Sequence, residues 1–116
     1  NKIYVNDIKT LEKWLKKETI RIFEERLEYN YNRFEENIPF PKLRIRSMKT
    51  RWGVCNRKNL TVTINSALIR ESIDAIDYVI IHELSHLVHF NHSSAFWQTV
   101  GKYFPKYKQI RKELRE

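Results

Sequence analysis

The stretch IDAIDYVIIHELSHLVHFNH, residues 73–92, determines how the rest of the chain must fold. Residues 73–90 carry apolar side chains on most sides at helical spacing, and Ser72 in front of them is a typical N-cap residue. A helix that is apolar on most of its surface is buried by other elements. We therefore expect a helix over about 73–90 at the centre of the domain.

All four histidines of the chain lie within this stretch, at the end of the expected helix. His82 and His86 are one helical turn apart, so their imidazoles can converge on one cation. Glu83 lies beside them, where it can take a proton from water, which is the chemistry of the H-E-x-x-H motif. Burying several imidazoles together is unfavourable unless something satisfies them, which favours a metal site over ordinary polar residues.

A hydrolytic zinc site needs a third protein ligand. His92 can serve only if the helix ends before it and the chain turns back, which Asn91 permits because it tolerates the left-handed conformation. His89 or a distant carboxylate are the alternatives. On an unbroken helix His89 would lie about 10.5 Å along the axis from His82. The chain is not a metzincin, because His89 replaces the glycine of that longer motif and Met48 lies upstream of it.

The flanking segments indicate an α+β fold. Residues 6–37 predict a long N-terminal helix, capped by Asn6 or Asp7, with a bend or break near 17–19 where the apolar stripe shifts. Residues 42–48 and 60–65 alternate apolar and polar side chains, which predicts two strands of a small sheet or hairpin over about 42–65, joined by an irregular loop. A short helical turn at 66–70 and two C-terminal helices, separated at Pro105, complete the prediction.

Composition limits the class of protein. The single cysteine, Cys55, cannot form an internal disulfide, which favours a reducing, cytoplasmic location. No apolar run has membrane-spanning length, so we expect no membrane partner. The formal charge of +8 favours anionic partners. We expect one domain, 1–116, that can be a piece of a longer protein because it begins at Asn1.

Two segments, TRWGVC (50–55) and IDYVIIHELSHLVHFNHSSAFW (76–97), resemble the YgjP-like metallopeptidase domain family, and more distantly the WLM and SprT-like proteases. The resemblance covers about residues 7–112 and implies a zincin-like fold, one Zn²⁺ ion and a peptide or protein substrate. It also implies that His82, His86 and His92 are metal ligands and Glu83 the catalytic base. Val54 stands where the family usually has serine.

The sequence leaves the other contacts of the substrate open. Candidates to bind substrate or stabilise an oxyanion are Arg51, His89 and Tyr78, whereas Trp52, Phe96, Trp97 and Cys55 are expected mainly in the core. The strand LTVTIN, 60–65, is a candidate edge for an extended peptide.

Two other functions stay open. Basic residues within 42–58 would suit a metal-dependent hydrolase of nucleotide phosphoanhydrides or other anionic small molecules. The basic tail KYFPKYKQIRKELRE, 102–116, would suit a nucleic-acid-associated module with an inert metal site.

Overall fold

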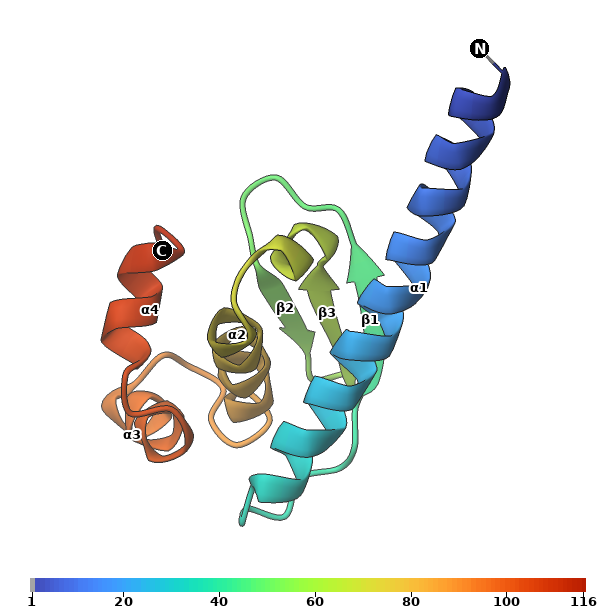
Figure 1. Cartoon of the computed structure of the whole chain (residues 1–116). Coiled ribbons are helices and arrows are strands. Elements are labelled where there is room, and N and C mark those ends of the chain that lie inside the picture. Colours follow the sequence, from blue (N-terminus) through green and yellow to red (C-terminus); the bar gives the residue numbers. More distant parts are fainter. Residues whose placement is uncertain (1) are drawn as a thin grey trace.

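The computed structural model describes residues 2–116, with side chains from residue 7 onward. It is an α+β fold with a small sheet, as the sequence predicts (Figure 1). The elements in chain order are α1 (Lys2–Arg33), β1 (Lys42–Arg46), β2 (Gly53–Asn56), β3 (Thr61–Asn65), the 3₁₀-helix η1 (Ser66–Arg70), α2 (Ile73–Ser85), α3 (Ser94–Tyr103) and α4 (Tyr107–Glu113).

Helix α2 is the central element of the fold. It packs against α1, the sheet, α3 and α4, and lies between α1 on one side and α3 with α4 on the other (Figure 1). Every residue from Ala75 to Ile81 is buried, which confirms the interpretation of its apolar pattern. The predicted cap is also confirmed, since the Ser72 side chain accepts a hydrogen bond from the Ala75 amide at 3.1 Å.

The end of α2 differs from the prediction. The helix ends at Ser85 rather than near Phe90, because the next amides bond three residues back instead of four. His86 N–H donates to Glu83 O at 3.1 Å, and Leu87 and Val88 repeat this spacing. Such 3₁₀-type bonds tighten the last turn of a helix. The chain therefore leaves the helix axis before Asn91, and His92 is free of the helical register.

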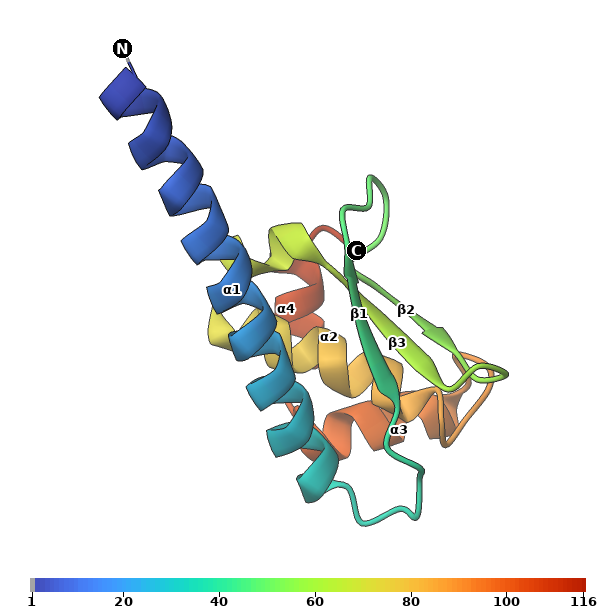
Figure 2. The ribbon, with the colours of Figure 1, turned by 90° about the vertical axis from the view of Figure 1, so that its right-hand side faces the viewer.

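Helix α1 is continuous, so the predicted start at Asn6 or Asp7 and the predicted break near 17–19 are both wrong. The hydroxyl of Thr19 donates to Leu15 O at 2.8 Å within the unbroken helix. The apolar stripe shifts because the two halves have different surroundings. Residues 7–17 are exposed, whereas Phe23 and Leu27 are in the core. Figure 2 shows the first half of α1 extending past the rest of the molecule.

The sheet has three strands in the order β1-β3-β2. Strand β1 pairs in parallel with β3, and β2 pairs antiparallel with β3. Strand β2 lies in the segment predicted to be a loop, so the hairpin joins β2 to β3 rather than the two predicted strands. Because β3 is paired on both sides, the prediction that it offers a free edge is wrong, and β2 is the edge strand beside α2.

One face of the sheet is in the core and the other faces solvent. Val62 and Ile64 of β3 are fully buried, and Leu43 and Ile45 of β1 pack against the same core. The alternate residues of β1, all basic, are exposed: Lys42, Arg44 and Arg46.

The C-terminal helices follow the prediction. The Ser93 side chain caps α3 by accepting a hydrogen bond from the Phe96 amide, and Phe96, Val100 and Ile110 reach the core. In the described part of the chain, no helix combines the length and the apolar character needed to cross a bilayer.

Candidate metal centre

Three imidazoles come together at the end of α2. His82 and His86 project from the helix and its cap, and His92 comes from the loop that leads to α3. Each offers one ligand atom, and the three atoms lie within 4.8 Å of one another. Two nitrogens on a tetrahedral zinc are separated by roughly 3.4 Å, so small ring rotations would bring the set to coordination distance. The donor set therefore fits a zinc ion.

Contacts at Nδ1, the nitrogen not needed for a metal, orient two of these rings. His82 Nδ1 lies 3.1 Å from Glu83 Oε2, and His86 Nδ1 lies 3.3 Å from Phe90 O. A carboxylate or carbonyl beside Nδ1 favours the proton on that nitrogen, which leaves Nε2 with its lone pair. Both imidazoles are thereby prepared to offer Nε2 to a metal. The Phe90 carbonyl is available because α2 has already ended.

The environment also favours neutral rings. Burial, followed by the nearby His82 and His92, lowers the pKa of His86, although Glu83 opposes this. Burial and then His82 lower the pKa of His92. The fully buried ring of Phe96 lies below all three imidazoles, with ring centroids 5.1, 4.6 and 4.9 Å from His82, His86 and His92. Neutral imidazoles are the form that binds metal.

Glu83 is held next to this cluster by β2. Its side chain is buried, and Oε2 accepts the contact from His82. Gly53 of β2 packs directly on it, because a Cβ at Gly53 would lie 2.9 Å from Glu83 Oε2 and 2.9 Å from a methyl carbon of Val79. The other carboxylate oxygen of Glu83, Oε1, makes no hydrogen bond within residues 7–116. Because every fully buried side-chain oxygen among the described residues has a partner, Oε1 must be reached by solvent.

The three candidates for substrate contact have different positions. His89 is turned toward α3: Thr99 gives its hydroxyl proton to Ala95 O, so His89 Nε2 donates to Thr99 Oγ1 at 3.1 Å. Arg51 is exposed, and its side chain has no hydrogen bond or ion pair within residues 7–116. Within residues 7–116, no hydrogen bond, ion pair or ring contact joins either residue to the three histidines. The buried Tyr78 does contact the cluster, with its ring 5.9 Å from that of His82, and its hydroxyl donates to Glu116 Oε1 at 2.7 Å.

Two neighbours of the site are not predicted from the sequence. Trp97 packs against the core, as predicted, but it is half-buried and its ring also lies nearly parallel to that of His92, with centroids 5.9 Å apart. Gly53 lies in the segment predicted to be a loop. A glycine inside a strand marks a close approach of another group, but this signal exists only once β2 is known. Cys55, two residues along, is half-buried, and burial followed by Glu83 raises its pKa to about 11.

The fold and the histidine cluster define a zinc-dependent peptidase of zincin-like architecture. The chain belongs to the YgjP-like metallopeptidase domain family, whose sequence model matches residues 4–116. The crystal structure of the metallopeptidase zymogen abylysin from Pyrococcus abyssi is similar to it, with 32% sequence identity and a TM-score of 0.72 over 79% of this chain and 90% of that one.

A second structure has the same fold. The metallopeptidase zymogen jannalysin from Methanocaldococcus jannaschii shares 23% identity, with a TM-score of 0.60 over 83% of this chain and 92% of that one. No curated protein matches the chain. The chain is therefore a zinc metallopeptidase that acts on peptides or proteins. This result gives no support to phosphoanhydride hydrolysis or nucleic-acid binding.

Proposed function

We propose that His82, His86 and His92 bind a single Zn²⁺ ion and that Glu83 is the general base of peptide hydrolysis. The convergence of three ligand atoms within 4.8 Å is the observation that carries this proposal. A zinc ion held by these residues would act as a Lewis acid, making water more acidic and polarising the scissile carbonyl.

Glu83 performs the proton transfers. Oε2 is fixed by His82 and by the packing of Gly53, so the solvent-facing Oε1 accepts the proton of the attacking water and returns it to the leaving amine. Tyr78 remains the candidate for oxyanion stabilisation, because it is the one candidate in contact with a ring of the cluster. To stabilise the oxyanion, the Tyr78 hydroxyl would have to break its hydrogen bond to Glu116.

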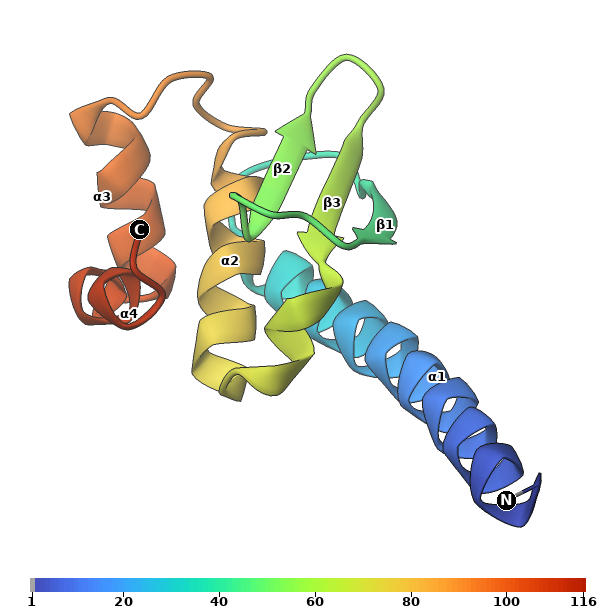
Figure 3. The ribbon, with the colours of Figure 1, turned by 90° about the horizontal axis from the view of Figure 1, so that it is seen from above.

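The substrate would bind as an extended strand along β2. This strand pairs only with β3 among the described strands, and its first residue, Gly53, touches Glu83. Backbone pairing along the open edge would therefore deliver a peptide carbonyl to the base. Figure 3 shows β2 as the strand of the sheet nearest α3. We further propose that this single domain functions in a reducing, cytoplasmic compartment.

Replacing Glu83 by glutamine tests the mechanism. Glu83→Gln keeps the shape of the side chain but removes the base, so we expect unchanged zinc content and a loss of peptide cleavage of at least about 10²-fold. Elemental analysis and cleavage of denatured casein measure the two quantities. The exposed Glu71→Gln is the matched control and should retain full activity. Full activity in Glu83→Gln, or two zinc ions per chain in native mass spectrometry, would contradict the proposal.

A further inference from the structure

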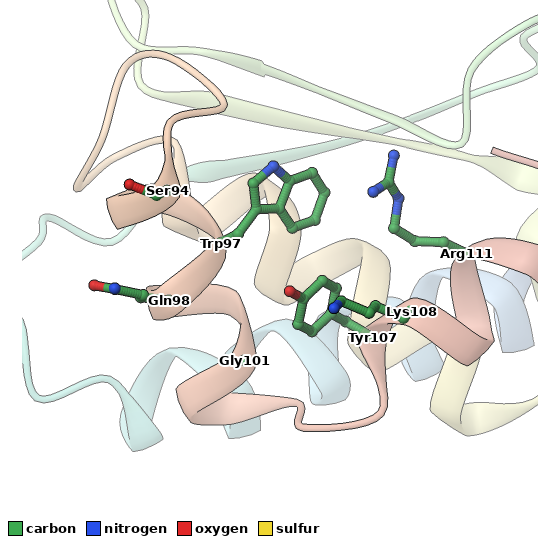
Figure 4. A pocket seen from close by; sticks show the side chains of 7 residues that line it. All are labelled: Ser94, Trp97, Gln98, Gly101, Tyr107, Lys108 and Arg111. Atoms are coloured by element: carbon green, nitrogen blue, oxygen red, sulfur yellow. The ribbon is translucent and has the colours of Figure 1, made fainter.

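A cavity of about 600 Å³ opens between α3 and α4 (Figure 4). Trp97 and Tyr107 supply aromatic surface, and Lys108 and Arg111 supply two cationic groups. No acidic residue is among those that line it. The proposed mechanism uses none of these four side chains, so the cavity needs an explanation of its own.

The aromatic wall of this cavity is built by close packing. Trp97 and Tyr107 are stacked, with ring centroids 5.3 Å apart and planes inclined by 17°. This approach depends on Gly101 of α3, because a Cβ there would lie 3.3 Å from Tyr107 Cε1. The Arg111 guanidinium lies over the Trp97 ring, 4.4 Å from its centroid. A guanidinium stacked on indole keeps its N–H edge available for a planar anion.

Trp97 connects the cavity to the candidate metal centre. Its ring lies 5.7 Å from that of His82 and 5.9 Å from that of His92, while Arg111 lies 4.4 Å away over the same ring. These separations span no more than about three residues of extended chain, at roughly 3.3–3.6 Å per residue. A peptide bound at the histidines can therefore place a nearby group beside Trp97, within reach of Arg111.

The two cations have donors to offer. Arg111 uses Nε for a 3.3 Å contact with Glu116, whereas its terminal nitrogens have no hydrogen-bond partner in residues 7–116. Lys108 is exposed and, over the same residues, takes part in no ion pair. An ionised carboxylate accepts such donors and can be held by an arginine through two parallel hydrogen bonds. The positive charge and the free donors of Lys108 and Arg111 match this one chemical group.

We propose that the cavity is a specificity pocket for a carboxylate of the peptide substrate, within three residues of the scissile bond. The inference rests on the proposed peptidase function and adds a substrate class to it. The carboxylate is either an Asp or Glu side chain or the C-terminus of the peptide, since both present the same group. Lys108 and Arg111 bind it, and Trp97 packs against the adjacent apolar part of the substrate.

A binding experiment tests this without relying on turnover. The probes are fluorescein-labelled alanine-based octapeptides in which one Glu walks along the sequence, a matched Gln series, and each peptide as free acid and as amide. Zinc-loaded Glu83→Gln protein binds them without cleaving them. We expect Glu at one or two positions to bind about tenfold more tightly than Gln. If the free acids alone show this gain, the C-terminal carboxylate is the bound group.

Variants of the two cationic residues test whether the tighter binding of the Glu peptides depends on the pocket. In the Glu83→Gln background, Lys108→Gln and Arg111→Gln should each remove most of the preference. Lys108→Gln is the decisive variant, because Lys108 forms no ion pair within residues 7–116. Lys112→Gln, an equal charge change on the exposed side of α4, should leave the preference intact.

Equal binding of Glu and Gln peptides and of acids and amides, or a preference that survives Lys108→Gln, overturns the inference. Failure of the proposed function is a separate result, in which the unaltered zinc-loaded protein cleaves none of the peptides it binds.

Discussion

At the scale of single residues, Gly53 shows how a missing side chain can position Glu83, the proposed general base. Gly53→Ala adds a methyl group 2.9 Å from both Glu83 Oε2 and Val79, which is too close for the neighbours to stay in place. We expect zinc binding to persist and kcat for peptide cleavage to fall about 10–100-fold, because a displacement of about 1 Å at a base is that costly.

The control for this change is Val54→Ala, since Val54 points to the opposite face of the same strand. It should leave kcat nearly unchanged. If Gly53 has a purely structural role, Gly53→Ala lowers the free energy of unfolding but does not move the acid limb of the pH–kcat/KM profile. If Gly53 positions Glu83, Gly53→Ala shifts this limb.

Cys55 reports on the charge of Glu83. Burial, followed by the charge of Glu83, raises the thiol pKa to about 11, so roughly one molecule in a thousand carries the thiolate at pH 8. We expect slow alkylation by iodoacetamide at pH 8 that accelerates up to about pH 11. The urea-unfolded protein should react with an ordinary thiol profile, and Glu83→Gln should shift the folded profile to lower pH. An unshifted profile in that variant would show that the two groups do not interact.

At the scale of the elements, a polar cluster fixes α1 against α2. Arg26 donates twice to Asp77, at 2.8 and 2.7 Å, and Asn30 adds a bond at 2.9 Å. Asp77→Ala leaves these donors without an acceptor in a mostly buried contact, so we expect a loss of about 2–3 kcal/mol in the free energy of unfolding. Urea denaturation at pH 7 measures it.

The matched control lies on the same helix. Asp74, in the first turn of α2, is exposed, so Asp74→Ala should lose no more than about 1 kcal/mol through the helix dipole. Equal losses in the two variants would mean that Asp77 acts only as a surface charge.

Much of the element order follows from periodicity, and the errors have physical causes. Helices α2 and α3 were predictable because their apolar patterns and serine caps agree. Helix α4, which has no side-chain cap, was predictable from the position of Pro105 and from the helical spacing of its apolar residues. Strand β2 was not, since Gly53–Asn56 is short and its stability comes from pairing with β3, which a local pattern cannot reveal. The break predicted in α1 was wrong. The apolar stripe shifts because the first half of α1 faces solvent and the second half faces the core, and a helix can pass from one environment to the other without a break.

Part of the candidate site could likewise be predicted from the sequence, and part could not. The imidazoles on α2 could be predicted because helical geometry relates them, and His92 could be predicted once the helix was required to end. The placement of Gly53 against Glu83 and of Trp97 beside His92 depends on tertiary packing between elements distant in sequence. The spacing of residues within one segment carries no information about such contacts.

At the scale of the whole molecule, the core and the site are formed by the same part of the chain. The molecule measures 56 × 29 × 23 Å, and residues 7–17 are all exposed. The packed region therefore begins in the second half of α1, where Phe23 and Leu27 meet α2. The loop that carries His92 lies on the opposite side of α2 and joins it to α3. A metal bound by all three histidines would thus cross-link α2 to the segment that leads into α3.

Zinc should consequently stabilise the entire fold. A ligand that binds only the native state adds about 2.7 kcal/mol to the free energy of unfolding at one hundred times its Kd, which raises Tm by roughly 10 °C in a domain of this size. Thermal unfolding followed by circular dichroism, with zinc and with a chelator, measures this shift. His92→Ala removes one ligand, so most of the shift should disappear. His89→Ala is the matched control, because His89 bonds Thr99 instead: it can lower the baseline Tm but should keep the zinc-dependent increase. An equal shift in wild type and His92→Ala would mean that His92 is not a ligand, and the link between the metal and α3 would then be absent.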